Sequence, residues 1–400
     1  MRLRFALSRI LAVVLVAACA QRVLDHLAAA QSPTGVTRED IFVPHVSTVP
    51  ANAGEHVGIS VRHVRSTDRP PTKGTVLFTN QGSTSTLALL DLNYKTYSIA
   101  AALAEEGFDV YLMDHTAYGR SPRPTMDDPC NADPSDQRLL IPNPLAAPCT
   151  ARYPRHLVTI FTELPEIDSV VDYIRRQTGR SRVSLAGWSR ATFRFGLYAA
   201  QHPEKVERLA LLGPGYRPDA PAEFPPSNTL TNDQAPRAAV PPWPFTVRRL
   251  EEPLIPWERM RRCEDIVDPG VHEALMTSLR TYVDPGAASW GTPPGMLYRV
   301  PTGSQVDAGW NRASAKRMKV PVLLVVGEHD PRFAQEAPTL YADLGSTEKT
   351  MVKVQCATHF LLFERNHKVV HRAFAEFLTQ GTVNGRQGVV TVDREGKYLH

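Results

Sequence analysis

The stretch that decides the fold of this chain is Arg182-Val-Ser-Leu-Ala-Gly187-Trp-Ser189-Arg-Ala191-Thr-Phe-Arg-Phe-Gly-Leu-Tyr-Ala-Ala200. Its first part, residues 183–186, is a short apolar run typical of a buried strand. After a sharp turn through residues 187–191, apolar side chains recur at helical spacing, with Phe193 and Leu197 on one face. The pattern predicts a strand, a tight turn and a helix, with a serine on the turn.

A serine in that position has its hydroxyl pushed clear of the sheet, and the first N–H groups of the helix point toward whatever the hydroxyl attacks. Strand and helix backbones nearly touch there, so only small residues fit two positions before and after the serine. Gly187 and Ala191 meet this requirement, which gives the pattern G-x-S-x-G with alanine in the last place. The turn therefore predicts that Ser189 is a nucleophile. The alternative is a serine that only caps the helix, and the rest of the chain must decide between the two.

Length and composition indicate a globular protein with a large core. The chain has 400 residues, of which 42% are hydrophobic and 22% charged, and this length fits one α/β domain with an inserted subdomain. The net charge of +4 is small, and no basic run is interleaved with aromatic residues, which argues against binding to nucleic acid. The 34 prolines cluster at residues 121–154 and 214–301, so we expect long loops or a lid there.

Residues 1–30 are typical of a secretory signal peptide. Arg2, Arg4 and Arg9 precede an apolar run at residues 10–20 that is too short to span a bilayer, and small residues follow. The alternative is a buried N-terminal helix. We therefore predict export, to the periplasm or beyond, and no other stretch approaches the length of a transmembrane helix.

The end of the signal segment has more than one interpretation. Val16-Ala-Ala-Cys19 resembles a bacterial lipobox, in which Cys19 would carry a lipid anchor. Residues 18–20 and 28–30 are equally good sites for ordinary cleavage. The sequence leaves anchoring undecided.

Four further cysteines are candidates for disulfides, because their number is even and the chain is predicted to be exported. Cys130 and Cys149 bracket one proline-rich loop, so their pairing is the simplest, and it would leave Cys263 with Cys356. Two other pairings are open, and so are buried free thiols.

The remaining segments alternate between strands and helices. Apolar runs predict strands at 40–46, 56–65, 75–79, 109–113, 206–212, 320–326 and 350–354, and helical spacing predicts helices at 97–106, 163–177, 334–343 and 366–378. Strands that are apolar throughout belong to a parallel sheet with helices on both faces.

Residues 214–318 interrupt this alternation. They are rich in proline and tryptophan and show helical patterns near 244–265 and 270–283. We therefore expect a core formed by residues 31–213 and 319–380, with a helical lid at 214–318. Residues 381–400 are expected to be a C-terminal tail, in which 388–393 is the one strand-like pattern.

A serine hydroxyl needs an adjacent base, and the base needs a group that orients it. His359 follows the strand at 350–354 and is the predicted base, while Asp330 follows the strand at 320–326 and is the predicted acid. Glu328 and Asp219 are the rival acids, Asp219 because it follows an earlier strand. The alternatives without a catalytic role are that Asp330 only caps the next helix and that His359 is a surface histidine.

At this point the chain resembles the α/β-hydrolase superfamily. The resemblance rests on Gly-Trp-Ser-Arg-Ala, Gly-Glu-His-Asp-Pro and Ala-Thr-His-Phe-Leu, in the family's order of nucleophile, acid and histidine, and on the turn at residues 114–122. It covers about residues 70–380. It implies a mostly parallel, twisted sheet with helices on both faces and a lid inserted before the strand that leads to the acid.

The family also implies an oxyanion hole made of two backbone N–H groups. Arg190, after the nucleophile, supplies one. The second comes from the loop after the third strand, where the family commonly has His-Gly-x and this chain has Gln81-Gly82-Ser83. We assign it to Ser83, with Gln81 as the alternative, and we expect Gln81 and Trp188 to line the substrate pocket.

The resulting prediction is an exported serine esterase that needs no cofactor and no metal, since the chain has no H-E-x-x-H or CxxC pattern and no phosphate-binding glycine loop. One rival is an amidase or aminopeptidase of the same fold, which would need an acidic group in the lid to bind a substrate amine; Glu251, Glu252, Glu258, Glu264 and Asp265 are available. The other rival is a non-catalytic binding protein on a hydrolase scaffold.

Overall fold

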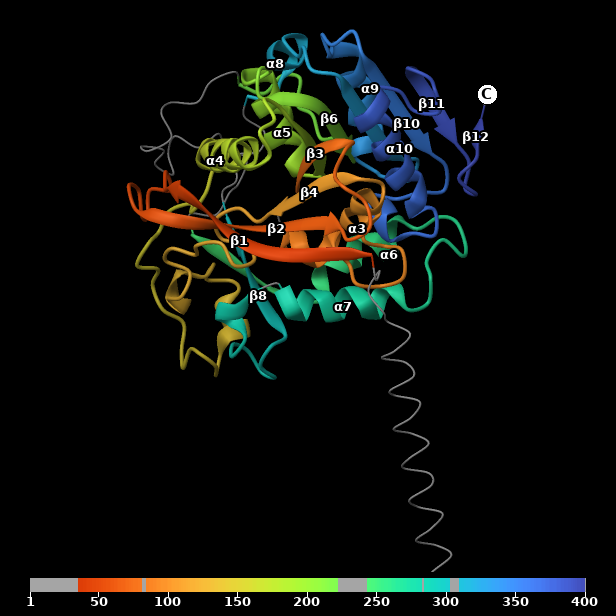
Figure 1. The fold of residues 1–400 in the computed structure, drawn as a ribbon. Helices are drawn as coiled ribbons and strands as arrows, with labels where there is room; N and C mark the ends of the chain where they lie inside the picture. The colour runs from red at the N-terminus through yellow and green to blue at the C-terminus, as the bar shows by residue number, and fades with distance from the viewer. Residues whose placement is uncertain (1–34, 81–83, 222–242, 283, 303–308, 400) are drawn as a thin grey trace, which may run out of the picture.

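The computed structural model describes residues 35–80, 84–221, 243–282, 284–302 and 309–399 (Figure 1). The predicted signal segment with Cys19 lies outside these residues, as do Gln81 and Ser83.

A ten-stranded sheet forms the centre of the molecule, in the order β1-β2-β4-β3-β5-β6-β9-β10-β11-β12. Neighbouring strands run parallel from β4 to β11, whereas β1, β2 and β12 are antiparallel to their neighbours. The strands are β1 Val36–Val46, β2 His56–Ser66, β3 Gly74–Thr79, β4 Phe108–Met113, β5 Val183–Trp188, β6 Val206–Leu212, β9 Val322–Gly327, β10 Lys349–Val354, β11 Gly388–Val392 and β12 Tyr398–Leu399.

Helices cover both faces of the sheet because the central strands are apolar on both sides. In β5, Val183 and Leu185 join the core on one face, while Ala186 and Trp188 join the core on the other. The first core includes α4 (Ile160–Thr178), α5 (Ala191–Gln201), α8 (Arg312–Lys316) and α9 (Phe333–Asp343). The second includes α2 (Thr86–Leu90), α3 (Ile99–Glu105) and α10 (His367–Gln380).

The segment between β6 and β9 holds α6 (Ile255–Met260), α7 (Val271–Tyr282) and a two-stranded sheet of β7 (Phe245–Arg249) and β8 (Leu297–Pro301). The helical pattern expected near 244–265 is present as α6, but the expectation was wrong for residues 245–249, which form β7. Phe245 and Val247 are buried while Thr246 and Arg248 are not, which is the period of a strand. The helix expected at 270–283 is present as α7.

The proline-rich loop at 121–154 is packed against the inserted segment. Met126, Leu140 and Leu145 share a third apolar cluster with Phe245 and Trp290. The backbone N–H of Asp133 donates to the Phe245 carbonyl at 2.9 Å, and Asp136 accepts from the Val247 N–H at 2.9 Å. The two proline-rich stretches therefore form one unit beside the main sheet.

The C-terminal residues expected as a tail extend the sheet, and the strand-like pattern expected at 388–393 is present as β11. β11 pairs in parallel with β10, and β12 pairs with β11. Val390 and Val392 are buried in the same core as α10, and this apolar burial holds the segment on the sheet edge.

Two disulfides join the four cysteines, Cys130 to Cys149 and Cys263 to Cys356. This is the simplest of the three pairings that the sequence allowed. The first closes the proline-rich loop over a separation of 19 residues, and the second joins the inserted segment to the loop after β10 over 93 residues.

Because a longer closed loop restricts the unfolded chain more, the second disulfide should contribute more stability than the first. In the chain-entropy model the contributions are about 5 kcal/mol and about 3 kcal/mol. We therefore expect the double variant Cys263→Ser/Cys356→Ser to melt at a lower temperature than Cys130→Ser/Cys149→Ser. Peptide mapping without reductant should recover both pairs, and free Cys263 in the oxidised protein would contradict the assignment.

Candidate active site

Ser189 lies on a left-handed turn between β5 and α5, with φ +61°. A residue with a side chain rarely adopts this conformation, and such strain is typical of functional sites. The Ser189 N–H donates to the Leu212 carbonyl at 2.9 Å, which joins the turn to the end of β6. A Cβ atom on Gly187 would lie 3.2 Å from both Ala191 and Phe195, so the close approach expected from the sequence is present.

Asp330 and His359 form a hydrogen-bonded pair beside this turn. The Nδ1 atom of His359 is 2.6 Å from Oδ2 of Asp330. The other carboxylate oxygen, Oδ1, accepts from the backbone N–H of Phe333 at 3.1 Å, at the start of α9. Asp330 therefore caps the helix and contacts the histidine at the same time. The two roles that the sequence offered as alternatives for Asp330, a helix cap and a partner of His359, are both present.

The rival acids lie elsewhere. Glu328 accepts from the backbone N–H of Cys356 at 2.9 Å. Asp219 is exposed, in a turn beyond the end of β6. Of the three acids, Asp330 is the one in contact with His359.

Ser189 and His359 both lie beside the end of β6, Ser189 through its bond to Leu212 and His359 through its ring next to Gly213. Gly213, the residue after Leu212, has φ +54°, and a Cβ atom there would lie 2.9 Å from two atoms of the His359 ring. Ser189 and His359 are 7% and 8% exposed, so the pair is largely closed off from solvent. The cavity of about 910 Å³ between α3 and α10 has none of these residues in its lining.

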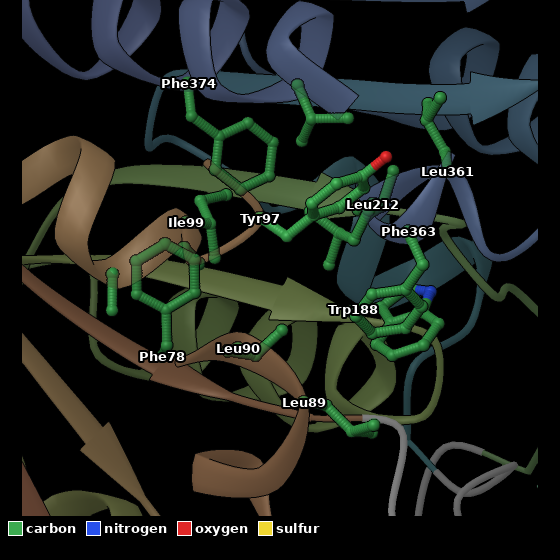
Figure 2. Close-up of a cluster of buried hydrophobic side chains, with 14 of the residues drawn as sticks. Phe78, Leu89, Leu90, Tyr97, Ile99, Trp188, Leu212, Leu361, Phe363 and Phe374 are labelled. Atoms are coloured by element: carbon green, nitrogen blue, oxygen red, sulfur yellow. The ribbon is translucent and has the colours of Figure 1, made fainter. Parts of the chain in front are cut away.

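Aromatic side chains surround the histidine. The ring centres of Phe333, Trp188 and Phe360 lie 4.9, 5.5 and 5.7 Å from that of His359. Trp188 is 1% exposed and packs against Phe363, as Figure 2 shows. Its indole N–H donates to the His359 carbonyl at 3.0 Å, so it holds the backbone of the histidine as well as packing on its ring.

The structure places only part of the expected oxyanion hole. Arg190 lies at the N-cap of α5, where the helix dipole favours negative charge. Ser83 and Gln81 lie outside the described residues, but the segment that follows them is held firmly. Asp114 accepts from the Ser85 hydroxyl at 2.7 Å and from the Thr86 N–H at 2.5 Å.

Sequence reasoning missed a second buried acid, Glu364, which is fully buried next to the histidine loop. It bonds to Thr358 and to Trp257 of α6. Burial raises the pKa of its carboxyl to about 7. The one signal in the sequence is an acid placed directly after the apolar run Phe360-Leu-Leu-Phe363.

His115 and His329, two histidines near the site, have other partners. His115 is 2.8 Å from Glu166, and burial lowers the pKa of its imidazole to about 3. His329 Nε2 lies 3.6 Å from Cys263 Sγ. In the described part of the chain, Cys263, Cys356 and His329 are the side chains that gather as metal ligands could, but the two sulfurs are joined to each other and offer no thiolates.

Solved structures of esterases, lipases and related hydrolases are similar to the chain at low identity. A monoacylglycerol lipase from Paleococcus ferrophilus is 16% identical, with TM-score 0.45, covering 81% of this chain and 99% of its own. A 2-hydroxy-6-oxo-6-phenylhexa-2,4-dienoate hydrolase from Rhodococcus sp. strain RHA1 is 15% identical, with TM-score 0.46 and coverages of 85% and 99%. Est1E from Butyrivibrio proteoclasticus, solved with ferulic acid, is 13% identical, with TM-score 0.43 and coverages of 80% and 94%. Likenesses this distant carry no argument about substrate.

Curated protein sequences contain no match to the chain. A family profile described as alpha/beta hydrolase fold matches residues 87–257, which include the serine turn. The parallel sheet order, the left-handed serine after β5 and the acid and histidine after β9 and β10 agree with that match. The chain has the α/β-hydrolase fold.

Proposed function

We propose that the chain is an exported serine hydrolase that cleaves carboxylic esters through an acyl-enzyme. The observation that carries the proposal is the hydrogen bond of 2.6 Å between Asp330 and His359, next to a serine held on a left-handed turn. This arrangement supports a nucleophile, a base and an orienting acid in the order Ser189, His359, Asp330.

In this mechanism the Nδ1–H group of His359 donates a hydrogen bond to the Asp330 carboxylate and keeps its proton, so the unprotonated Nε2 can accept the proton of the Ser189 hydroxyl. The serine oxygen attacks the ester carbonyl, and the negative charge that develops is stabilised by the backbone N–H groups of Arg190 and Ser83. His359 then returns the proton to the leaving alcohol, and water releases the acyl group by the same route.

Residues 31–213 and 319–380 would form the catalytic core, with 214–318 as the lid, and the sheet would extend through β12. Export is supported by the two disulfides, which form in oxidising compartments. No helix within the described residues is both long and apolar enough to cross a bilayer. A lipid anchor at Cys19 stays a prediction from the sequence.

The nucleophile can be tested by covalent labelling. A fluorophosphonate should modify the protein on Ser189, because the activated hydroxyl attacks phosphorus as it attacks a carbonyl. Ser189→Ala should fold normally and hydrolyse a short aryl ester about 10³-fold more slowly or worse. Mass spectrometry locates the adduct, and an adduct on Ser85 in place of Ser189 would refute the assignment.

Labelling also separates this proposal from its rivals. Absence of any adduct would favour a non-catalytic binding protein. Aryl esters of increasing chain length, assayed beside aminoacyl amides, distinguish an esterase from an amidase. In the lid, Glu252 and Glu258 already pair with Arg248 and Arg261, so an amine-binding role would fall to other acids.

The orienting acid is tested by Asp330→Asn against Asp219→Asn. The first should lower kcat by about 10³-fold or more, because the amide cannot hold the imidazole in its required tautomer or stabilise its charge. The second should leave kcat nearly unchanged, because Asp219 is exposed and apart from His359. The reverse pattern would move the acid to the end of β6.

Close packing at the end of β6 gives a further prediction. Gly213→Ala and Gly179→Ala should both lose stability, since φ is positive at each position. A Cβ atom on Gly213 would meet the His359 ring, whereas nothing lies within 4 Å of one on Gly179. Turnover of a short ester should therefore fall in Gly213→Ala only, and equal turnover in the two folded variants would contradict this view of the site.

A further inference from the structure

The loop that carries His359 is fixed by a carboxylate outside the proposed triad. Glu364 follows the short 3-10 helix Leu361–Phe363 and is 0% exposed. Its Oε1 accepts from the Thr358 hydroxyl at 2.5 Å and from the indole N–H of Trp257 at 3.1 Å. Its Oε2 accepts from the Thr358 N–H at 3.2 Å.

These contacts surround the histidine on both sides. Thr358 directly precedes His359, and its hydroxyl also accepts from the N–H of Phe360, which directly follows, at 3.0 Å. Because that hydroxyl has one proton, accepting from Phe360 leaves the proton for Glu364. One carboxylate therefore sets the position of both neighbours of the base.

The same carboxylate reaches the inserted segment. Trp257 lies in α6, is fully buried and stacks on Phe360 with ring centres 5.7 Å apart. Its separation from Glu364 along the chain is 107 residues, so this hydrogen bond joins the proposed lid to the histidine loop.

We propose that Glu364 is a positioning residue for His359 and that its ionised carboxylate couples the placement of this base to α6 of the inserted segment. The inference rests on the proposed function, in which His359 is the base. A carboxylate fits here because all three partners are donors and an ionised carboxylate only accepts. In a protonated carboxyl or an amide, one of the two positions becomes a donor and faces another donor.

Burying the Glu364 carboxylate destabilises the folded protein, and this loss of stability is consistent with a functional role. Burial raises the pKa of Glu364 to about 7, from an ordinary value of 4.5. Between these two pH values the folded state holds the proton more tightly than the unfolded state, so this group lowers stability as the pH rises through that window. Near neutral pH this carboxyl is therefore partly ionised although burial disfavours its charge, and a pKa perturbed in this way is a feature of functional sites.

Few other charged groups act on this carboxylate. The charge of Arg261, at the end of α6, lowers the pKa of Glu364. His367, on α10, contacts the backbone carbonyl of Glu364 at 2.7 Å and not its carboxylate. Arg365 points to Asp268, at 3.5 Å. The hydrogen bonds from Thr358 and Trp257 also favour the ionised form.

The test compares Glu364→Gln with Glu166→Gln in the full-length protein. Glu166 is a matched control because it is also buried, with a pKa raised by burial to about 7, but lies on α4 across the sheet. With a short aryl ester, Glu364→Gln should lower kcat about tenfold and leave KM within about twofold, since the base is misplaced while the binding surface remains. Glu166→Gln should keep kcat within about twofold.

A spectroscopic measurement separates positioning from general loss of structure. The indole ¹H–¹⁵N signal of Trp257, assigned with Trp257→Phe, should titrate with a midpoint near pH 7 in the wild type. It should be flat in Glu364→Gln. If Glu364→Gln does not fold, Thr358→Val should lower kcat in its place, and Thr358→Ser should recover most of the loss because it restores the hydroxyl.

Wild-type kcat in folded Glu364→Gln, or an indole signal of Trp257 that has the same position in the wild type and in folded Glu364→Gln throughout the range from about pH 5.5 to 8.5, would overturn the proposal. These outcomes are distinct from failure of the hydrolase assignment. In that case the wild-type protein would show no fluorophosphonate adduct on Ser189, whatever the behaviour of Glu364.

Discussion

The candidate site depends on close backbone approach at the carboxyl ends of three adjacent strands. Gly187 in β5, Gly213 after β6 and Gly327 in β9 each lie where a Cβ atom would meet another part of the site. At Gly187 the obstacle is the start of α5, at Gly213 it is the His359 ring, and at Gly327 it is the carbonyls of Ala357 and Thr358, at 2.5 Å. Larger residues would push the serine turn, the histidine and the acid apart. The site is compact because these positions have no side chain.

The histidine loop is also the place where the inserted segment and the main sheet are joined. The Cys263–Cys356 disulfide enters it from the insertion, three residues before His359. The Trp257–Glu364 hydrogen bond reaches its other end, and Trp188 holds the His359 carbonyl from β5. A base whose own ring contacts Asp330 is therefore supported by a covalent bond, a buried carboxylate and an indole. Such surrounding contacts orient reactive groups more precisely than the reactive groups can orient each other.

Two buried acids of this chain differ in the partners that they have. Glu163 of α4 and Arg194 of α5 are both fully buried and form a bidentate ion pair, with distances of 2.7 and 2.5 Å, so each charge has a matching partner. Glu364 has neutral donors as its hydrogen-bond partners; these bonds lower its pKa, but burial outweighs them and raises the pKa to about 7. A paired charge fixes structure with little sensitivity to pH, whereas an acid that burial leaves near neutrality can change its state. Because of this contrast, Glu364 and not Glu163 is suited to couple a change of protonation to the position of the base.

The sequence by itself determined the features that are encoded locally. The strand, the turn and the helix around Ser189 could be predicted because their signals lie within about twenty residues of one another: the periodicity of apolar side chains, the small residues and the tight turn. The parallel sheet covered on both faces followed from strands that are apolar throughout, and the order of serine, acid and histidine placed three side chains at one edge. The simplest cysteine pairing is also the one in the structure.

Only the tertiary structure decided which groups touch. The sequence left Asp330, Glu328 and Asp219 as rivals, because contact with His359 depends on how separate strand ends meet. It assigned residues 245–249 to a helix, and it gave a strand-like pattern at 388–393 but no place for it in the sheet, because those strands take their partners from distant segments, β8 and β10. Glu364 was missed for the same reason, because its contact with Trp257 spans 107 residues. The raised pKa of its carboxyl comes from burial, which the order of residues does not show. The local periodicity of the sequence predicts which side chains are buried, but the tertiary structure determines which residues each of them contacts.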